Sequence, residues 1–331
     1  MACNDAVVTE DSYGSLRFQR AMEASGASLL DKAIKHGSFY CHATIACGGQ
    51  GTVYLATGDD RALSRICVVK TFSARDADAL DRARRSIRTQ LSLMDQACRW
   101  PAPLLPHDDQ IRPAPWVPDI LAWNLNASAP WVAQDFRGTN LRRYLAAPIE
   151  AGRTRPDEVS LGIAHVRDRV LSQIVIAVEF VHLQGVVHRD LKPDNVLVEK
   201  VAAQNLLMES IALCDFDLSK DRGRTALTQT AAQMGSFGYS APEQLWGGAR
   251  HATFASDVYS VGMLAVFVYT GRQPWEVLIG PDPTRMTLDP AIAERLGSKR
   301  DWVEQALSVH PDARPALGEL HRYIYGPDAG R

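Results

Sequence analysis

The stretch VHRDLKPDN, residues 187–195, decides the fold class, and CDFDLSK follows it at residues 214–220. The first stretch brings the Asp190 carboxylate, the Lys192 ammonium and the Asn195 amide into one short loop, and the second adds a carboxylate at Asp215. Phosphoryl transfer requires a carboxylate that orients a hydroxyl, oxygen ligands for Mg²⁺ and a lysine beside the phosphate. We therefore expect catalytic roles for Asp190 and Lys192, and metal binding by Asn195 and Asp215.

A glycine-rich turn, ACGGQGTV at residues 46–53, lies between two strand-like runs. Glycines let backbone N–H groups approach phosphate oxygens that a side chain would block. Lys70 ends the second strand-like run, where it would project under the turn towards the α- and β-phosphates of a nucleotide. Taken alone, the turn is equally a simple hairpin and Lys70 a solvated lysine at a strand edge. The expected nucleotide contacts are Ala46, Gly48, Gly49, Gly51, Val53 and Lys70.

Taken together, these motifs resemble the eukaryotic-type protein kinase family, and the resemblance covers roughly residues 39–325. It continues in GSFGYSAPE at residues 235–243, in SDVYSVG around Asp257 and in HPDARP around Arg314. Lys192 and Ser236 look like the serine/threonine branch of the family. The resemblance implies an α+β, bilobal protein kinase-like fold. Its small, β-rich N-lobe would hold an antiparallel sheet plus helix C, and its larger C-lobe would be mainly α-helical.

The resemblance and the residue patterns together suggest boundaries along the chain. We expect an N-terminal extension over residues 1–38, with one or two amphipathic helices within 15–35. The N-lobe would occupy residues 39–136, with a proline-rich insert near 100–118; the C-lobe would occupy 137–325, and 326–331 would be a tail. Within the lobes, we expect strands over 119–123, 131–136, 195–199 and 211–216, and helices over 75–97, 141–146 and 165–184, with only helix and loop after residue 241.

The resemblance also assigns roles to residues that no local chemistry singles out. Gln134 matches the position that gates the adenine pocket, and Asp135 to Arg137 match the hinge whose backbone holds adenine. Arg189 matches the residue that binds a phosphate on the activation loop, where the candidate acceptors are Thr225, Thr228 and Thr230; each of these is equally an ordinary loop residue. Ser236 and Glu243 belong to the substrate-site segment. Asp257 and Arg314 match residues that support the loops, with Arg314 pairing with Glu243.

The sequence departs from the family pattern in four places. Ala46 replaces the first glycine of the turn, and Asp217 replaces the glycine of the DFG motif. No glutamate occurs between residues 24 and 149, so the usual acidic partner of Lys70 on helix C is missing. Gln90 is the best candidate for that clamp and Asp95 the second; alternatively, Gln90 faces solvent and Lys70 pairs only with nucleotide. The fourth departure, the proline-rich insert, is either a partner-binding arm or a rigid surface loop.

Composition restricts the remaining possibilities. The 331 residues carry a net charge of −2, which shows no footprint of nucleic-acid binding. Residues 1–10 lack the pattern of a secretory signal, and no apolar run reaches the roughly 18 residues of a membrane span. The six cysteines show no CxxC spacing and read as reduced thiols of a cytoplasmic protein. Cys47, in the glycine turn, either makes ATP binding sensitive to oxidation or is just a small residue.

These expectations combine into an ATP- and Mg²⁺-dependent serine/threonine protein kinase, with Mn²⁺ as an acceptable substitute metal, that phosphorylates protein substrates and itself. Two alternatives remain open. The missing helix-C glutamate and Asp217 would fit a pseudokinase, an ATP-binding scaffold without transfer activity. A small-molecule kinase would share the core motifs but typically lacks the GSxxYxAPE block. A docking partner would bind at the N-terminal extension or at the proline-rich insert.

Overall fold

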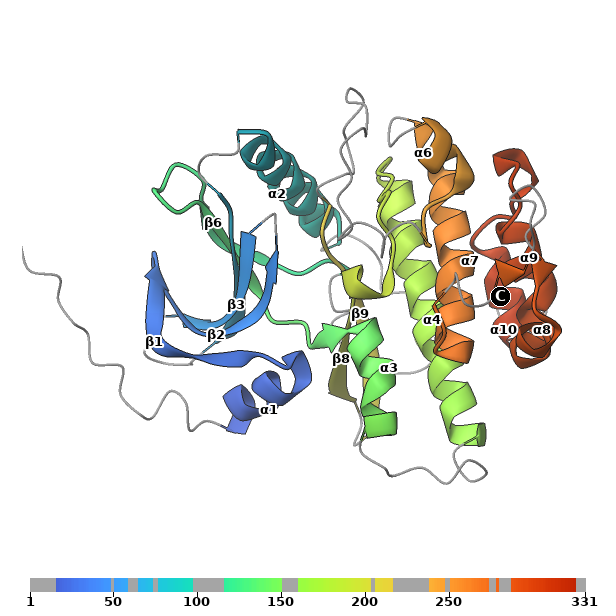
Figure 1. The fold of residues 1–331 in the computed structure, drawn as a ribbon, viewed down its shortest axis with the longest axis horizontal. Coiled ribbons are helices and arrows are strands. Elements are labelled where there is room, and N and C mark those ends of the chain that lie inside the picture. The colour runs from blue at the N-terminus through green and yellow to red at the C-terminus, as the bar shows by residue number, and fades with distance from the viewer. Residues whose placement is uncertain are drawn as a thin grey trace, which may run out of the picture. The chain divides into compact units, whose positions relative to one another are not determined.

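A computed structural model of the chain describes residues 16–48, 51–58, 65–73, 77–97, 116–150, 160–203, 206–216, 238–247, 251–273, 278–279 and 287–325. The chain forms two compact units. The N-terminal unit comprises residues 1–91 and 118–139, and the C-terminal unit comprises residues 92–117 and 140–331. An antiparallel sheet dominates the first unit and helices dominate the second, which confirms the expected fold class (Figure 1).

The N-terminal unit is built on a six-stranded sheet of order β1-β2-β3-β4-β6-β5, in which all neighbouring strands are antiparallel. One face of this sheet buries a cluster of small and aromatic side chains, including Cys41, Cys67, Val69 and Trp131. The strands are rich in β-branched and aromatic residues, which favour a pleated, half-buried surface. Their bounds are Ser28–His36 for β1, Phe39–Gly48 for β2, Gly51–Gly58 for β3, Ile66–Thr71 for β4, Ile120–Asn124 for β5 and Trp131–Asp135 for β6.

The opposite face of the sheet carries the expected nucleotide-binding side chains. The register pairs Val53 with Lys70 and Val68 with Gln134. Directly paired residues point to the same side, and so do residues two apart on one strand, so these four side chains share one face. The expected Lys70 and Gln134 are thereby placed side by side on the sheet by strand pairing alone. We call this side the Lys70 face.

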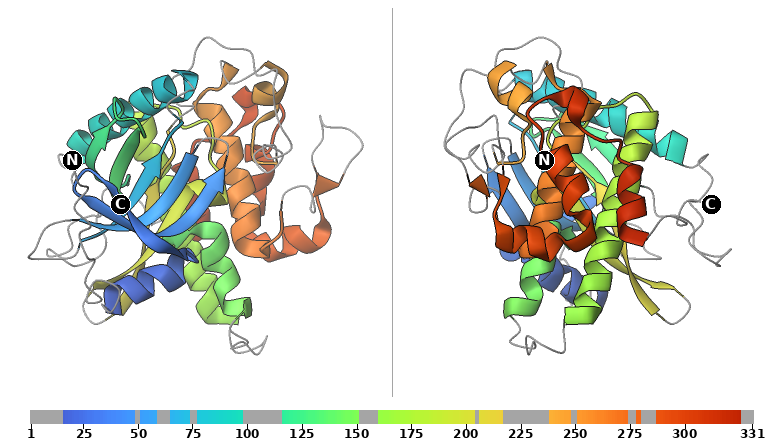
Figure 2. Two further views of the ribbon diagram at one scale, coloured as in Figure 1. Left: turned by 60° about the vertical axis from the view of Figure 1, so that its left-hand side comes forward. Right: turned by 90° about the vertical axis from the view of Figure 1, so that its right-hand side faces the viewer.

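Helix α1 (Leu16–Ser25) and the part of helix α2 (Ala77–Ala97) up to Leu91 complete the N-terminal unit. Helix α1 buries Phe18 and Ala21 against Ala43 and Leu55, and Leu55 belongs to the Lys70 face. Helix α2 buries Ala79, Ala83 and Ile87, which recur at helical spacing along one side. The expected helix over residues 75–97 is therefore confirmed (Figures 1 and 2).

The expectation of helix throughout residues 15–35 is wrong in its second half, because Ser28–His36 is strand β1. Gly26, at φ 63°, ends α1 with a backbone bond to Met22, as left-handed glycines commonly do. Gly37, at φ 58°, then turns the chain so that His36 pairs with Phe39 of β2. Gly26 therefore ends the helix after Ser25, and the edge of β2 supplies the hydrogen bonds that make Ser28–His36 a strand.

The C-terminal unit surrounds helix α7 (Phe254–Thr270), whose residues from Ser256 to Tyr269 are all buried. A capping box of Thr253 and Ser256 begins this helix, and left-handed Gly271 ends it. Helix α4 (Ser160–Leu183) packs beside α7, as Figures 1 and 2 both show. Most of this unit's apolar core lies on these two helices and on strands β8 (Val196–Ala203) and β9 (Leu206–Leu213).

The other elements of the chain are shorter. Strand β7 (Thr139–Asn140) leads into α3 (Leu141–Glu150), and strands β8 (Val196–Ala203) and β9 (Leu206–Leu213) form an antiparallel hairpin. The pair of strands β10 (Leu278–Ile279) and β11 (Thr287–Leu288) differs from the expectation that only helix and loop follow residue 241, although each strand is only two residues long. Further helices of the described residues are α6 (Pro242–Gly247), α8 (Pro290–Leu296), α9 (Arg300–Ala306) and α10 (Glu319–Tyr325).

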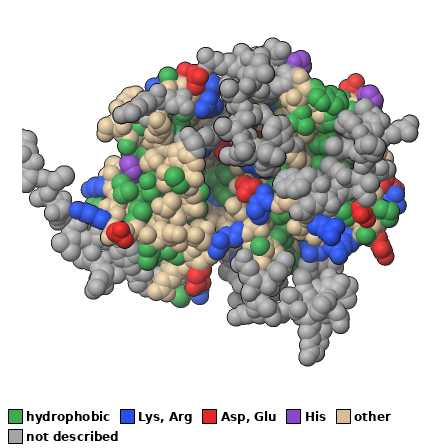
Figure 3. All heavy atoms as spheres, in the orientation of Figure 1, with side chains coloured by type: hydrophobic (Ala, Val, Ile, Leu, Met, Phe, Trp, Pro, Cys, Tyr) green, Lys and Arg blue, Asp and Glu red, His purple; other side chains and the backbone are tan. Residues whose placement is uncertain are grey.

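The surface carries charges of both signs. On the face drawn in Figure 3, acidic and basic side chains of the described residues are interspersed. Among the helices that the structure describes, none is long and apolar enough to cross a membrane.

Candidate active site

The loop at residues 187–195 organises its polar groups around Asp190. Lys192 Nζ donates to Asp190 Oδ2 at 2.8 Å, and Asn195 Nδ2 donates to the same oxygen at 3.0 Å and to the Asp190 carbonyl at 2.8 Å. A short 3₁₀ helix, Pro193–Asn195, turns Asn195 back towards the aspartate. Since both donors among the described residues reach Oδ2, Oδ1 is the carboxylate oxygen that is open to a substrate hydroxyl. The structure therefore brings the three predicted loop residues together.

Asn195 and Asp215 supply oxygen ligands of the kind that Mg²⁺ prefers. Because Asn195 turns its amide nitrogen to Asp190, its Oδ1 is the atom directed elsewhere. A backbone bond of 3.0 Å from Cys214 to the Asn195 carbonyl ties this residue to the segment that carries Asp215. Among the described residues, no group of three or more His, Cys, Asp or Glu side chains forms a metal site. These two residues therefore fit a Mg²⁺ ion that takes its other oxygen ligands from phosphate and water, as protein-bound Mg²⁺ usually does.

His188 links the two motifs from inside the core. Its ring is fully buried, and Nε2 lies 3.1 Å from the Cys214 carbonyl, while Nδ1 lies 3.4 Å from the Asp190 N–H. A carbonyl only accepts and an N–H only donates, so this geometry requires the neutral ring with its proton on Nε2. Burial lowers the pKa of His188, although the nearby Asp257 carboxylate opposes the shift. The neutral imidazole thus connects the backbone of both motifs.

Asp257 holds the loop backbone in an unusual conformation. Its Oδ2 accepts from the His188 N–H at 2.7 Å and its Oδ1 from the Arg189 N–H at 2.9 Å, while its own side chain is fully buried. His182 Nε2 also lies 2.9 Å from Oδ2. Arg189 has a φ of 72°, a left-handed conformation that is strained for any residue with a side chain. Asp257 therefore stabilises the strained backbone directly before Asp190.

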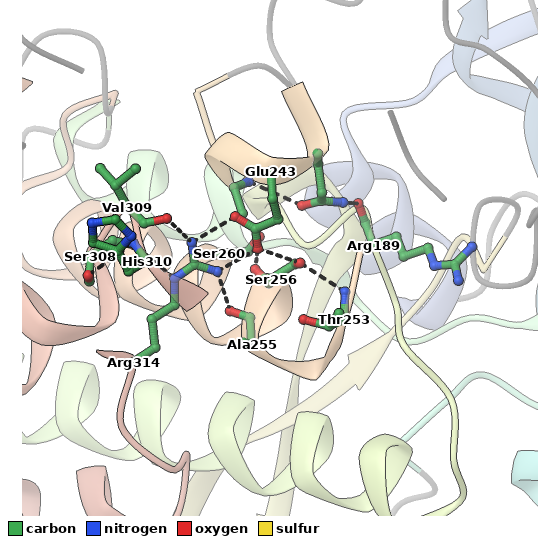
Figure 4. Close-up of polar contacts among 12 residues, drawn as sticks. Arg189, Glu243, Thr253, Ala255, Ser256, Ser260, Ser308, Val309, His310 and Arg314 are labelled. Atoms are coloured by element: carbon green, nitrogen blue, oxygen red, sulfur yellow. Dashed lines mark hydrogen bonds and ion pairs between the residues drawn. The ribbon is translucent and has the colours of Figure 1, made fainter. Parts of the chain in front are cut away.

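An ion pair between partly buried Glu243 and buried Arg314 anchors the segment that begins with the APE sequence (Figure 4). Arg314 donates to both oxygens of Glu243, at 2.6 and 2.8 Å, so the expected pairing is present. Ser256 adds a bond of 2.7 Å to Glu243, and Arg314 also donates to the Ala255 carbonyl at 2.8 Å. Burial alone would raise the pKa of Glu243, but the bonds from Arg314 and Ser256 outweigh it, and the pKa lies below its usual value.

Gln244 connects this segment to the catalytic loop. Its amide nitrogen donates to the Arg189 carbonyl at 3.0 Å, and its amide oxygen accepts from the Ala241 N–H at 3.1 Å. In Figure 4 the Arg189 side chain points away from the pair of Glu243 and Arg314. Sequence reasoning missed Gln244, His182 and His188, because their roles arise from bonds between distant segments. In the sequence, only Gln244 could have been singled out, because it directly follows the APE motif.

The glycine turn closes the hairpin of β2 and β3, in which Gly48 pairs with Gly51. Gly51 has a φ of 140°, and a Cβ there would lie 1.8 Å from the Thr71 carbonyl oxygen. At Gly48, by contrast, a Cβ would meet nothing within 4 Å. Ala46 is exposed and Val53 is half-buried on the same hairpin. The fold itself therefore requires glycine at residue 51 but not at residue 48.

The two expectations for Gln90 do not match its surroundings. Its side chain is 2% exposed, so it does not face solvent. Its amide nitrogen donates to the Pro118 carbonyl at 2.5 Å, and its amide oxygen accepts from Gln134 at 2.9 Å, so both amide atoms bind partners other than Lys70. Lys70 Nζ lies 5.5 Å from the ring centre of Phe72, and Asp95 is exposed near the end of α2.

Asp135 begins the segment that resembles the hinge. It exchanges backbone and side-chain bonds with Asp119, and its carboxylate lies 3.9 Å from the guanidinium of buried Arg137. Burial raises the pKa of Asp135 to about 6, although the charge of Arg137 opposes this shift. Both side chains are thus used within the N-terminal unit, and the backbone N–H of Asp135 is bonded to the Asp119 carbonyl as well.

Several predicted residues lie outside the described part of the chain: Gly49, Asp217, Thr225, Thr228, Thr230 and Ser236. The proline-rich insert lies outside it as well, except for Trp116 to Pro118.

Comparison with known proteins agrees with the geometry of the loop. The family described as the protein kinase domain matches residues 140–318, which is more than half of the chain. The serine/threonine-protein kinase PrkC of Bacillus subtilis is 27% identical over 307 residues, covering 91% of this chain and 40% of its own length. The serine/threonine-protein kinase PknL of Mycobacterium bovis is 29% identical over 258 residues, covering 77% of this chain and 54% of its own length.

A solved structure supports the fold. The kinase domain of Mycobacterium tuberculosis PknI, crystallised as a double mutant, aligns with a TM-score of 0.57 at 19% identity, covering 89% of this chain and 98% of that one. The chain spans between 20% and 54% of the length of these curated relatives and of a probable serine/threonine-protein kinase, PknB, from Lactococcus lactis. The match over residues 140–318 nevertheless includes Asp190, Asn195, Asp215 and Asp257. The chain belongs to the protein kinase family, in its eukaryotic-type serine/threonine branch.

Proposed function

We propose that this protein is an ATP- and Mg²⁺-dependent serine/threonine protein kinase that transfers the γ-phosphoryl group of ATP to hydroxyl groups of proteins. The observation that carries the proposal is the arrangement at Asp190, where Lys192 and Asn195 both bind Oδ2 and leave Oδ1 open. The names of its relatives support protein substrates over small molecules.

The catalytic loop would act on both the hydroxyl and the phosphate. Asp190 accepts or orients the hydroxyl proton through Oδ1, within a loop whose backbone Asp257 holds in place. Lys192, already bound to Asp190, offers its positive charge to the transferring phosphoryl group. A scaffold protein has no physical need for this constellation, and the residues that would bind the metal accompany it.

Asn195 and Asp215 would hold Mg²⁺ or Mn²⁺, which when bound neutralises charge on the phosphates. The chain contributes the orientation of these ligands. The bonds from Asn195 to Asp190 fix its amide oxygen, and His188 ties the Cys214 carbonyl, next to Asp215, to the catalytic loop.

The N-terminal unit would bind the nucleotide with its Lys70 face. Among the described residues nothing lies within 4 Å of a Cβ built at Gly48, so a glycine there, between Ala46 and Gly49, would allow the close approach of a phosphate. Gly51 and Val53 follow in the same hairpin. Lys70 would position the α- and β-phosphates, and the backbone from Asp135 to Arg137 would hold adenine.

Regulation and location complete the proposal. Thr225, Thr228 and Thr230 are the first candidates for autophosphorylation, with Arg189 as the cation that would bind the added phosphate and Ser236 in the substrate segment. We further propose a cytoplasmic protein, with residues 39–136 and 137–325 as the two kinase lobes. A docking partner would bind at the proline-rich insert or at the N-terminal extension, residues 1–38.

The test is incubation of the purified chain with ATP and Mg²⁺, alone and with a mixture of serine- and threonine-containing peptides, with phosphate detected by intact mass. Wild type would be compared with Asp190→Asn, and with Asp194→Asn as a matched control in the same loop. The Asp194 carboxylate is bound to Arg142 at 2.7 Å. The control therefore removes one carboxylate charge from the same loop without changing Asp190.

We expect wild type and the Asp194→Asn control each to add phosphate to themselves or to the peptides. The Asp190→Asn variant should add none. Equal phosphorylation by Asp190→Asn would contradict the assigned role of Asp190. Binding of ATP by wild type without transfer to any hydroxyl would instead favour the pseudokinase, and transfer to a polar metabolite alone would favour a small-molecule kinase.

A further inference from the structure

The amides of Gln90 and Gln134 form a chain of hydrogen bonds that ends at a peptide carbonyl. Gln90 lies on α2 and is 2% exposed. Its Nε2 donates to the Pro118 carbonyl at 2.5 Å, and its Oε1 accepts from Gln134 Nε2 at 2.9 Å. All three residues belong to the N-terminal unit.

This chain fixes the orientation of both amides. The carbonyl of Pro118 can only accept, so Gln90 must turn its amino group towards it and its oxygen towards Gln134. Gln134 must then present its own amino group to Gln90. A flip of either amide would bring two acceptors or two donors face to face, at the cost of an unmade bond in a buried site. The Gln134 oxygen is therefore left as an acceptor that points away from Gln90.

The position of Gln134 determines what this acceptor can meet. Gln134 is half-buried and pairs with Val68 of β4, so it lies on the Lys70 face of the sheet. It directly precedes Asp135, whose backbone begins the segment assigned to adenine. The acceptor thus borders the place proposed for the purine base.

We propose that Gln134 is a specificity-determining residue that offers Oε1 to the exocyclic amine of adenine, and that Gln90 is the positioning residue that fixes this orientation. The inference rests on the ATP binding proposed above. Adenine carries an amino donor at the position where guanine carries a carbonyl acceptor. An acceptor fixed at this point pairs with adenine and faces an oxygen of guanine, so the site selects ATP over GTP.

The experiment compares the affinities for ATP and GTP, each with Mg²⁺, by competition against a fluorescent ATP analogue. Gln90→Leu keeps the size of the side chain but frees the Gln134 amide to flip and donate to guanine. We expect the preference for ATP over GTP to fall by about tenfold in this variant, since one hydrogen bond changes from unfavourable to favourable.

Gln90→Glu is the matched control. Its carboxylate still accepts from the Gln134 amino group, so the orientation and the preference for ATP should remain. It places an acceptor against the Pro118 carbonyl, so its melting temperature should fall. A purely structural role for Gln90 would lower stability in both variants without changing the ATP-to-GTP ratio in either. If Gln90→Leu does not fold, Gln134→Met removes the same acceptor and should also lower the ratio.

An unchanged ratio in folded Gln90→Leu, or in Gln134→Met, would overturn the inference while leaving the proposed function intact. Wild type that binds neither nucleotide would overturn the proposed function, and this inference with it.

Discussion

Single residues in this protein show the difference between what a motif predicts and what packing requires. The catalytic loop was predictable because its chemistry is local: Asp190, Lys192 and Asn195 are close in sequence and contact one another. Gln90 was placed by its spacing from Lys70, yet its partners, Pro118 and Gln134, come from other segments. A side chain that binds across segments leaves no periodic signal in the sequence, so its role becomes visible only in the fold.

Two glycines of the turn should respond differently to the same substitution. In Gly51→Ala, the new Cβ would overlap the Thr71 carbonyl, and we expect a loss of about 3 kcal/mol or more in the free energy of unfolding. In Gly48→Ala, the Cβ would meet no atom, so stability should stay within about 0.5 kcal/mol of wild type, while the KM for ATP rises. Urea unfolding and ATP titration would measure both effects. An equal loss of stability in the two variants would show that the turn has a different backbone.

Partly buried Glu243 and fully buried Arg314 should be strongly coupled. In Glu243→Gln, the fully buried Arg314 side chain would lose its countercharge, which typically costs about 3 to 5 kcal/mol. In the double variant Glu243→Gln with Arg314→Met, no uncompensated charge remains, so the loss should be smaller than the sum of the two single losses. A double-mutant cycle by urea unfolding measures this coupling, and strictly additive losses would contradict it.

At the scale of elements, long segments with a clear pattern were predictable, whereas their ends and the short strands were not. Helix α2 and strands β5 and β6 follow their apolar periodicity closely. Strand β1 does not, because its conformation depends on the exposed edge of β2 and on turns at Gly26 and Gly37. The residues ahead of the glycine turn are therefore part of the N-terminal unit, since α1 and β1 both pack on its sheet.

This integration of α1 gives a prediction about stability. Phe18 is 2% exposed and packs against Ala43 and Leu55, so Phe18→Ala should lower the free energy of unfolding by about 3 kcal/mol. Leu16, on the same helix, is 61% exposed, and Leu16→Ala should change it by less than about 0.5 kcal/mol. Thermal unfolding of the full chain would compare the two variants. If Phe18→Ala proved as mild as Leu16→Ala, α1 would not be part of the folded unit.

For the whole molecule, the order of the motifs predicted a β-rich unit followed by a helical one, because each motif occurs in only one place in the kinase fold. The sequence pattern could not show how the two units use their buried titratable groups. His42 in the N-terminal unit and His188 in the C-terminal unit are both almost completely buried, and burial lowers the pKa of each. In both units, titration of the buried histidine therefore changes the free energy of unfolding in the same direction as the pH falls.

The lowered pKa values of His42 and His188 predict a loss of stability in acid. Below the unfolded-state pKa of about 6.5, these histidines are protonated in the unfolded chain but stay neutral in the folded protein. The free energy of unfolding therefore falls as the pH drops. Each histidine contributes at most about 1.4 kcal/mol per pH unit. Asp135 acts in the opposite direction. Its pKa is raised to about 6, so it binds a proton more readily in the folded state than in the unfolded state. Its contribution to the free energy of unfolding is therefore present at low pH and is lost as the pH rises through that value.

Burial also lowers the pKa of His36 and raises the pKa of Glu179. Three histidines against two carboxyl groups should leave stability decreasing between pH 7.5 and 5.5. Urea unfolding at steps across this range would measure the slope. Asp135→Asn removes the opposing group and should make the slope steeper, whereas His42→Gln removes a contributing ring and should make it shallower, whatever either variant does to stability at pH 7.5. A slope that is unchanged in both variants would show that neither group titrates between the folded and unfolded states, and stability that rises in acid would reverse the assignment of His42 and His188 as neutral.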